Sequence, residues 1–568
     1  WPGVVIVLLQ WIVTYGSGLV APGTFLQIFS LGLGPLVGLA ALLAWWFFAS
    51  RAPRSERWWV VGAFVAGLVL MFVLAHPTMP LALVSYAMPI LCAAFILVTL
   101  LLRNAPSPVR RLALVAVVFV ACGFWVLLRS EGLDGDMGAQ LAWRWQKTTE
   151  EELLDAGLLA QVRDAEPRAA GLAAGGENLD PAAPWPGFRG PARDGVVHGT
   201  ALATDWSASP PEELWRRPVG PGWGSFALAG GLLFTQEQQG EDEVVVAYRA
   251  DSGEPVWLHQ DVARFMEAMG GPGPRATPTY DQGRIYSLGA TGLLNAFEAA
   301  TGRLLWSRNL AEDSGSPVPE WGFSSSPLIL DGRVIVVADG AAGKEIQAYD
   351  AENGAPSWSA AAGPFTYTSP HLAQLQGEPQ VLVVTAGGIT SVRPDGSPLW
   401  QHSWPLTRGA RVVQPAFTAD GDVLLGTGFG VGLQRFSVRR EGASWETQER
   451  WTSQGLKPYY NDLVVHRDHV YGFDGRILAC LSLADGSRAW KGGRYGNGQV
   501  LLLADQDLLL VLSDRGDVAL VKAEPTGFEE LATFPALEGK TWNHPVLADD
   551  VLYVRNSQEM AAFRLPTG

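Results

Sequence analysis

A turn followed by a tryptophan-bearing strand recurs along the C-terminal two thirds of the chain, and this repeat constrains the fold more than any other feature. The clear copies end at Trp257, Trp306, Trp358, Trp400 and Trp490, a looser copy carries Trp451, and Leu531 takes the place of the tryptophan in another. A spacing of 39 to 52 residues is typical of the four-stranded blades of a β-propeller. Because one blade cannot cover its own sheet face, each tryptophan is expected to cover the neighbouring blade.

The repeat also predicts how the ring closes. The last copy ends at Gly568 in its turn, and no tryptophan strand follows it. A strand of the missing kind, 213–220 with Trp215, precedes the first complete copy. Pairing this strand with the last blade would remove the open edge of the ring. The sequence therefore predicts an all-β eight-bladed propeller over 185–568, with an open solenoid as the alternative.

The first 130 residues differ from the rest in hydropathy and charge. They contain five apolar stretches near the ~20 residues needed to cross a bilayer, at about 4–20, 28–49, 58–75, 84–102 and 111–128. This region has seven Arg, no Lys and one acid, Glu56, for a net charge of +6, whereas the remainder carries −21. The contrast predicts an all-α transmembrane bundle of about five helices over 1–130, followed by an acidic soluble part. It excludes a wholly cytosolic chain and a basic nucleic-acid binder.

The arginines predict the orientation of the helices. Arg51, Arg54 and Arg57 follow the second stretch, and Arg103, Arg110 and Arg111 follow the fourth, whereas the other two loops contain no Lys or Arg. By the positive-inside rule the arginine-bearing loops face the cytoplasm. The N-terminus is then cytoplasmic, and the propeller is expected in the periplasm of a bacterium, anchored to the inner membrane and in contact with its lipid.

Two further features concern the spans themselves. No acid or Lys lies within the expected spans, which favours an anchor over an ion path. The spacing of Gly34 and Gly38 is that of small residues where two helices approach closely.

Residues 131–184 are expected to be a short helix and a flexible linker. The helix is expected from Leu141 onward and over 148–162, with Thr148 or Thr149 as its cap and three glutamates in its first turn. Residues 165–184 are rich in Ala, Gly and Pro and lack periodicity, as a tether does. Asp134-Gly-Asp136 lacks the further ligands of a calcium site.

The tryptophan repeats resemble the pyrroloquinoline quinone (PQQ) type β-propeller. This family includes PQQ-dependent alcohol and glucose dehydrogenases and the non-catalytic lipoprotein propeller of the outer-membrane barrel assembly machinery. The segment 185–195, Trp-Pro-Gly-Phe-Arg-Gly-Pro-Ala-Arg-Asp-Gly, is similar to the openings of bacterial PQQ-like propeller proteins. Five helices before an external propeller are similar to membrane-bound glucose dehydrogenase, which passes electrons to ubiquinone. Unlike those dehydrogenases, this chain has no adjacent cysteines and its propeller is near the minimum length.

The best candidate site is the mouth at which the first strands of all blades begin. Side chains expected there are Trp223 and Ser225, Arg275 and Thr277, Trp321 and Ser324, Tyr367 and Thr368, Arg411 and Gln414, Tyr460 and Asn461, Asn497 and Gln499, and Trp542 and Asn543. Arg275 and Arg411 could hold carboxylates of PQQ or of a peptide, and a tryptophan could stack on a flat ring. The alternative is that these groups cap strand ends and bind water.

Other motifs give no catalytic or metal-site assignment. His466 and His469 flank a hairpin turn without a third ligand. The glycine-rich run 426–432 leads into a strand and not into the helix that a phosphate loop needs. Cys92, Cys122 and Cys480 do not suggest a disulfide framework.

Two functions of different classes remain open. The first is a non-catalytic binding or scaffold subunit for periplasmic or membrane protein partners, without a cofactor. The second is a membrane quinoprotein dehydrogenase that needs PQQ, a divalent cation such as calcium, and a carboxylate base. The compact propeller and the missing cysteine pair favour the first.

Overall fold

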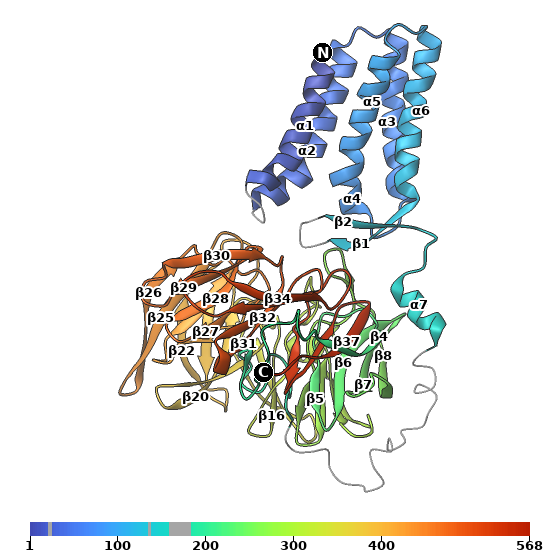
Figure 1. Cartoon of the computed structure of the whole chain (residues 1–568). Coiled ribbons are helices and arrows are strands. Elements are labelled where there is room, and N and C mark those ends of the chain that lie inside the picture. Colours follow the sequence, from blue (N-terminus) through green and yellow to red (C-terminus); the bar gives the residue numbers. More distant parts are fainter. Residues whose placement is uncertain (21–24, 134–137, 158–182) are drawn as a thin grey trace. The chain divides into compact units, whose positions relative to one another are not determined.

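The structure, a computed structural model, describes residues 1–20, 25–133, 138–157 and 183–568 (Figure 1). The chain divides into two compact units. One is residues 1–147 with 268–271, and the other is residues 148–267 with 272–568.

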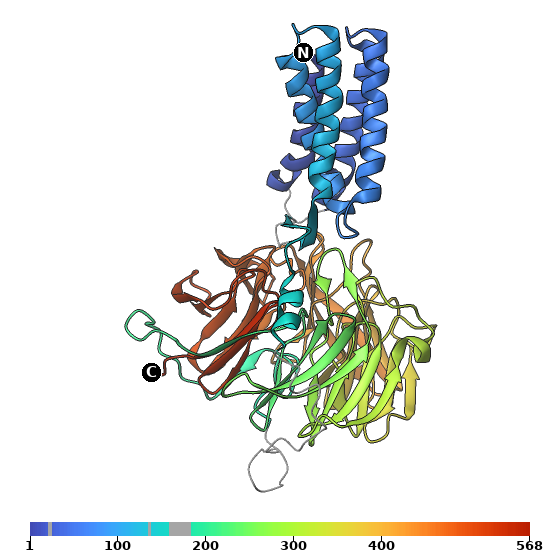
Figure 2. The same ribbon diagram turned by 90° about the vertical axis from the view of Figure 1, so that its right-hand side faces the viewer.

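The first unit contains five helical segments that are long and apolar enough to cross a membrane (Figure 2). They are α1 (Pro2–Val20), α2 (Phe25–Ala44) continued by η1 (Trp45–Ala49), α3 (Arg54–Leu74), α4 (Pro80–Ala82) continued by η2 (Leu83–Ala87) and α5 (Met88–Leu101), and α6 (Ser107–Val126). The predicted number of apolar helices is confirmed, and their ends differ by a few residues.

The helices of this unit pack through a core of aromatic and small residues. Phe95 lies edge-on against Trp46 and Phe64, with ring centroids 5.0 and 5.2 Å apart. At Gly34 and Gly38 of α2, an added Cβ would lie 2.7 and 2.4 Å from α1 side-chain atoms. The close approach predicted at these two glycines is therefore present.

One acidic residue that lies outside the predicted spans is part of a helix. Helix α3 begins at Arg54 and so includes Glu56, whose side chain is fully buried. Arg110 of α6 neutralises it, with 2.8 Å between Arg110 Nε and Glu56 Oε1. Helix α3 thus begins before the predicted apolar stretch 58–75, and Glu56 lies in this extension rather than in the stretch itself.

The segment after the helices contains a hairpin that the sequence did not predict. Strands β1 (Leu128–Leu133) and β2 (Ala139–Trp143) pair antiparallel, so the helix expected from Leu141 is wrong there. Helix α7 (Thr149–Ala156) begins as predicted at the Thr148 cap, whose Oγ1 accepts a hydrogen bond from the Glu151 N–H. The rest of that predicted helix, the expected tether as far as residue 182 and the Asp134–Asp136 loop lie outside the described residues.

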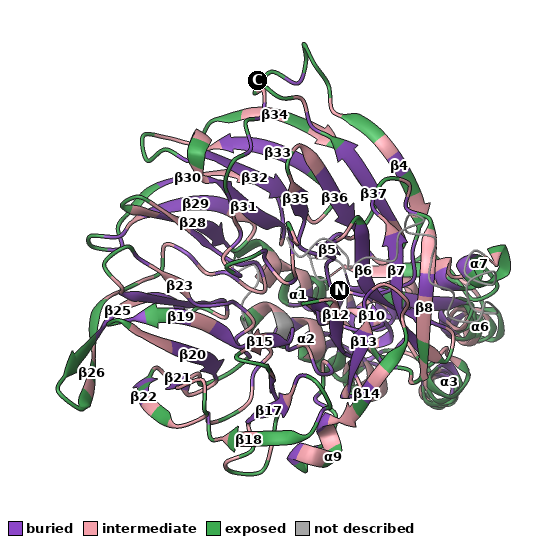
Figure 3. Cartoon of the chain, turned by 90° about the horizontal axis from the view of Figure 1, so that it is seen from below, coloured by how far each residue is buried: buried purple, intermediate pink, exposed green. Residues whose placement is uncertain are grey.

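The second unit is a ring of eight antiparallel sheets, seen along its axis in Figure 3. The predicted eight-bladed propeller is confirmed. Its first four blades are β5 (Ala227–Ala229), β6 (Leu232–Gln239), β7 (Asp242–Arg249) and β8 (Pro255–Val262); β11 (Thr279–Asp281), β12 (Arg284–Leu288), β13 (Leu293–Glu298) and β14 (Leu304–Asn309); β15 (Leu328–Leu330), β16 (Arg333–Val337), β17 (Ile346–Asp350) and β18 (Pro356–Ala360); and β19 (His371–Leu375), β20 (Glu378–Thr385), β21 (Gly388–Val392) and β22 (Pro398–Ser403).

Blades five to eight complete the ring. They are β23 (Ala416–Phe417), β24 (Val423–Thr427), β25 (Gly432–Glu441) and β26 (Ser444–Ser453); β27 (Val464–His466), β28 (His469–Asp474), β29 (Ile477–Ser482) and β30 (Arg488–Arg494); β31 (Gln499–Leu503), β32 (Leu508–Leu512), β33 (Asp517–Lys522) and β34 (Glu530–Pro535); and β35 (Val546–Ala548), β36 (Val551–Arg555), β37 (Glu559–Arg564) and β4 (Glu212–Pro218). Short elements outside the blades are β9 (Met266–Glu267), β10 (Gly271–Pro272), α9 (Leu310–Ser314) and η3 (Ala504–Gln506).

The ring is closed by strands from the two ends of the propeller sequence. Strand β4 pairs antiparallel with β37, with Trp215 opposite Ala562. The eighth sheet thus takes three strands from the C-terminal part and one from the N-terminal part, and β4 covers the edge that β37 would otherwise expose.

The tryptophans join neighbouring blades as the repeat predicts. Six indole N–H groups donate to a carbonyl in the last turn of the next blade. The pairs are Trp215 to Ala250 (2.9 Å), Trp257 to Ala299 (2.9 Å), Trp306 to Ala351 (3.1 Å), Trp358 to Pro394 (3.1 Å), Trp451 to Leu483 (2.7 Å) and Trp490 to Glu524 (2.7 Å). A glycine at positive φ leaves room for the ring, because a Cβ at Gly253 would lie 2.6 Å from Trp215.

Trp400 is the exception. Its indole donates to Gln380 Oε1 of its own blade at 2.7 Å, although its ring still packs against Phe436 of the next one. The next blade has the long hairpin β25–β26, whose turn at Gly442 lies far beyond the position of the usual docking turn. The length of that hairpin explains why the hydrogen bond is made within the blade.

Candidate functional site at the axis of the propeller

Polar residues at several strand starts join neighbouring blades by hydrogen bonds. Four main-chain N–H groups donate to a side chain of the following blade: Ser225 N to Thr277 Oγ1 (2.9 Å), Thr277 N to Ser326 Oγ (3.0 Å), Ser326 N to Ser369 Oγ (2.9 Å) and Gln414 N to Asp462 Oδ1 (2.6 Å). The Gln414 amide exchanges two hydrogen bonds with the main chain of Ser369, at 3.0 and 3.2 Å. These groups stabilise the ring and are not available to a ligand.

The seam between the first and last blades is held in the same way. Ser225 Oγ donates to the carbonyl of His544 at 2.6 Å. The Asn543 amide donates to the carbonyls of Gly222 and Gly224 at 3.0 and 2.7 Å.

A similar contact lies away from this seam. In the sixth blade, Asn461 Oδ1 accepts from the N–H of Tyr459 at 2.8 Å. Of the predicted site residues, Thr277, Asn461 and Asn543 therefore have mainly structural contacts.

The two arginines predicted to bind a carboxylate are used within the protein. Arg411 is fully buried and donates to the carbonyls of Thr385, Ala386 and Trp404. Burial lowers the pKa of Arg411 to about 10. Its guanidinium therefore holds a loop in place.

Arg275 is engaged by its own loop. It forms an ion pair with Glu267 (3.1 Å between Nη2 and Oε1), donates to the Gly273 carbonyl, and lies over the Phe265 ring. Burial lowers the pKa of Arg275 to about 10, although the charges of Glu267 and Glu243 oppose that shift.

The aromatic residues predicted at the mouth do come together, in two groups. In the first, the Trp542 ring lies 4.8 Å from Trp223 and 4.9 Å from Tyr460 between centroids. Lys540 Nζ lies over both tryptophans, 5.0 Å from Trp223 and 4.6 Å from Trp542. In the second, Trp321 stacks on Tyr367 at 4.7 Å. All five rings are partly exposed, and we call them the mouth aromatics.

Sequence reasoning missed a segment that fills the axis. Residues 185–197, the axial plug, contact the innermost part of six blades. Trp185 pairs with Leu228, and the Pro186 carbonyl accepts from Tyr280 N at 2.7 Å. The Phe188 ring lies 5.1 Å from His544. The last two residues form β3 (Val196–Val197), which pairs in parallel with β31.

Two buried arginines fix the axial plug. Arg189 donates to the Leu463 carbonyl at 3.0 Å and forms an ion pair with Asp462 at 3.4 Å. Arg193 donates to the carbonyls of Ser326 and Pro327, both at 2.9 Å. Both arginines have positive φ, 60° and 57°, which is strained for a residue with a side chain. In the sequence, the only sign that this segment is buried is the presence of two arginines in a glycine- and proline-rich stretch.

These charges shift the pKa of their buried neighbours. Burial alone would raise the pKa of Asp462, but Arg189 and the His544 hydrogen bond hold it below its usual range. Burial and the charges of Arg193 and Arg189 lower the pKa of His371 to about 3, although Asp462 opposes that shift. Burial, with Arg189, lowers the pKa of Arg193 to about 9.

The neutral state of His371 predicts a dependence of stability on pH. Below pH ~6.5 the unfolded chain protonates this histidine, whereas the folded chain does not until about pH 3. The free energy of unfolding should therefore fall on acidification, by up to ~1.4 kcal/mol per pH unit for this group. In His371→Leu the slope between pH 7 and pH 5 should be smaller. Urea unfolding of the detergent-solubilised chain measures both slopes, and equal slopes would contradict the prediction.

The two predicted PQQ ligands, Arg275 and Arg411, are engaged by groups of the protein itself. The mouth aromatics contact one another, with ring centroids 4.7 to 4.9 Å apart. Buried polar atoms of the predicted site residues that form no hydrogen bond with the described residues include the amide atoms Asn461 Nδ2, Gln499 Oε1 and Asn543 Oδ1 and the donors Trp542 Nε1 and Arg411 Nε. The three amide atoms are neutral, two of them are acceptors, and they do not compensate anionic carboxylates. Within the described ranges, no three His, Cys, Asp or Glu side chains form a group that could hold a metal ion.

The other motifs have structural settings. His466 Nε2 lies 2.5 Å from Asp507 Oδ1 beside the β27–β28 turn. The glycine-rich run connects β24 and β25. The three cysteines are free and buried.

A comparison with protein-family models agrees with the fold. Residues 241–492 match a PQQ-type family model described as outer membrane protein assembly factor BamB. The crystal structure of BamB from Moraxella catarrhalis is 17% identical, covers 63% of this chain and 98% of that chain, and has a TM-score of 0.45. The quinohemoprotein alcohol dehydrogenase from Comamonas testosteroni is 14% identical, covers 72% and 86%, and has a TM-score of 0.46. No curated protein sequence matches the chain.

Proposed function

We propose that this chain, a PQQ-like β-propeller preceded by five apolar helices, is a binding or scaffold subunit for protein partners in an inner-membrane assembly. The helices anchor it in the bacterial inner membrane with the N-terminus in the cytoplasm, and the propeller lies in the periplasm. The match to the BamB family model supports a propeller that binds proteins. The arginine-bearing loops support the orientation.

The mouth aromatics carry the proposal. Tryptophan and tyrosine are enriched among the residues that dominate protein–protein binding energy. Here two indoles, a phenol ring and an ammonium group lie together and partly exposed, whereas polar groups at the strand starts such as Ser225, Thr277 and Gln414 already have partners in the protein. The mouth therefore offers contact area to a partner and few unpaired charges for catalysis.

The test removes the first aromatic group. In the Trp223→Ala, Trp542→Ala double variant, partners that co-purify with the full chain in mild detergent should be lost. Hot-spot residues contribute ~2 kcal/mol or more, so affinity should fall at least about thirtyfold. The matched control is Trp445→Ala on the β25–β26 hairpin, where a half-buried tryptophan lies 5.5 Å from Arg440.

Three outcomes would count against a scaffold. The first is that the purified chain has no partner, and the second is that the control loses partners as the double variant does. The third is that added PQQ and calcium bind and support dye reduction. That third result would favour the alternative, a membrane quinoprotein dehydrogenase that passes electrons to a quinone.

A further inference from the structure

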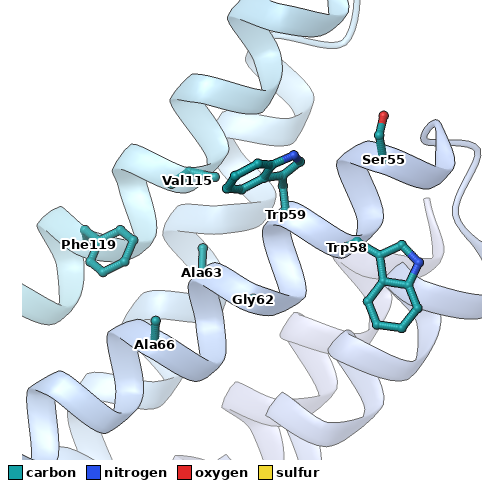
Figure 4. A pocket seen from close by; sticks show the side chains of 8 residues that line it. All are labelled: Ser55, Trp58, Trp59, Gly62, Ala63, Ala66, Val115 and Phe119. Atoms are coloured by element: carbon teal, nitrogen blue, oxygen red, sulfur yellow. The ribbon is translucent and has the colours of Figure 1, made fainter.

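A surface groove lies between α3 and α6 in the helical unit (Figure 4). Its volume is about 490 Å³, within the ~300–1,000 Å³ of typical ligand sites. The walls are almost entirely apolar and include Trp59, Gly62 and Ala66 from α3 and Val115 and Phe119 from α6. Trp59 and Phe119 are 61% and 40% exposed, so the groove opens to the outside of the unit.

Polar groups lie at one end of this groove. Ser55 lines it one helical turn before Trp59. On α6, Arg111 precedes Val115 by four residues, so it lies one turn before Val115 on the same helix face. This is the end of the unit that carries six of the seven arginines of residues 1–130.

The arginines at this end differ in what they contact. Arg57 donates to the carbonyls of Phe47, Ser50 and Ala52, and Arg110 is paired with Glu56. The Arg111 side chain, like those of Arg51, Arg54 and Arg103, forms no ion pair or hydrogen bond with any part of the chain that the structure describes. Because Glu56 is already neutralised, nothing in residues 1–130 offsets the charge of Arg111.

We propose that the α3–α6 groove binds an anionic phospholipid. Its acyl chain occupies the apolar groove, and its phosphate contacts Arg111 and the Ser55 hydroxyl. Basic pockets between transmembrane helices on the cytoplasmic side are suited to such headgroups, and tryptophans such as Trp58 and Trp59 favour the same interfacial depth. A transmembrane helix of a partner protein is about 10 Å wide and would need a broad face to pack against. This groove is instead a pocket with an arginine near one end, which suits a lipid better than a helix. The inference rests on the proposed membrane placement of the helices.

The test uses the full chain in nanodiscs or mild detergent and counts bound lipid by native mass spectrometry. The probes are phosphatidylglycerol and phosphatidylcholine with identical acyl chains. The parent chain should retain phosphatidylglycerol in preference. Gly62→Leu should abolish the retention, because an added Cβ at Gly62 meets no atom within 4 Å and the side chain would fill the groove. Gly123→Leu is the matched control, since Gly123 on α6 is equally open but does not line the groove.

A second pair of variants tests the headgroup. Arg111→Gln should reduce the preference for phosphatidylglycerol about fivefold, the effect of one arginine near a charged surface. Arg103→Gln, at an exposed position in the preceding loop, should change it little.

Three results would overturn the proposal. They are equal retention of the two lipids, equal retention by Gly62→Leu and Gly123→Leu, and a dimer of the parent chain that Gly62→Leu dissociates, which would place a second copy in the groove. Extraction of the chain without detergent would instead refute the membrane placement itself.

Discussion

Replacing Arg189 with alanine is expected to destabilise the propeller by about 3–5 kcal/mol, the usual effect of removing one partner from a buried ion pair. Arg189 is 2% exposed, and its guanidinium faces a carboxylate that is also buried, Asp462. Without Arg189, Asp462 would keep only the hydrogen bonds from Gln414 N–H and His544. The free energy of unfolding, or hydrogen exchange of the innermost strands, measures the loss.

Two variants show which part of the interaction matters. Asp462→Asn introduced into the Arg189→Ala chain should recover part of the stability, because it removes the uncompensated charge. Arg467→Ala is the control for backbone conformation. Arg467 also has positive φ (51°) and pairs with an aspartate, Asp507, but it is 71% exposed. That control should change stability by less than ~1 kcal/mol, and an equal loss in the two alanine variants would contradict the role of burial.

Replacing Trp215 with alanine is expected to cost about 3–5 kcal/mol, as for other large-to-small changes of a buried tryptophan. Trp215 is 8% exposed, donates to the Ala250 carbonyl, and packs over Gly253 of the first blade. It lies on β4, so the loss acts at the seam where the ring closes. Hydrogen exchange should show faster opening of β4 and β37 than of the other blades.

The Trp445→Ala variant again serves as a control for this change. Its tryptophan lies on the outer hairpin β25–β26 and, among the described residues, forms no indole hydrogen bond to another blade. We expect a smaller loss for it than for Trp215→Ala, because Trp445 is only half-buried. If Trp215→Ala left the exchange of β4 and β37 unchanged, the seam would not depend on this indole.

The fold could be predicted because it depends on spacing. The turn glycines and the tryptophans recur at blade length, and apolar stretches of helix length mark the first unit, so both patterns are visible in one sequence. The predictions are less accurate where tertiary contacts override the local sequence preference. Leu141 lies in the hairpin strand β2 rather than in a helix, and Trp400 bonds within its own blade because the next hairpin is long.

The site was predicted less completely, for a physical reason. Sequence shows which residue type starts each strand, but not whether its polar atoms already have partners. Arg275 and Arg411 have the chemistry of carboxylate ligands, but three main-chain carbonyls surround Arg411 and Glu267 pairs with Arg275. The axial plug depends on contacts with blades far away in sequence, which no local pattern reports.

The seam has a consequence for biogenesis. Arg216 of β4 and its ion-pair partner Glu559 of β37 are 343 residues apart. During synthesis β4 emerges before the other strands of the eight blades, while its partner sheet emerges after the remaining seven blades have been made. The ring therefore cannot close before the last blade has been made. Until it closes, β4 lacks its partner strand, and a large loop separates the two strands. A chaperone that shields unpaired strands would act longest on residues 212–218.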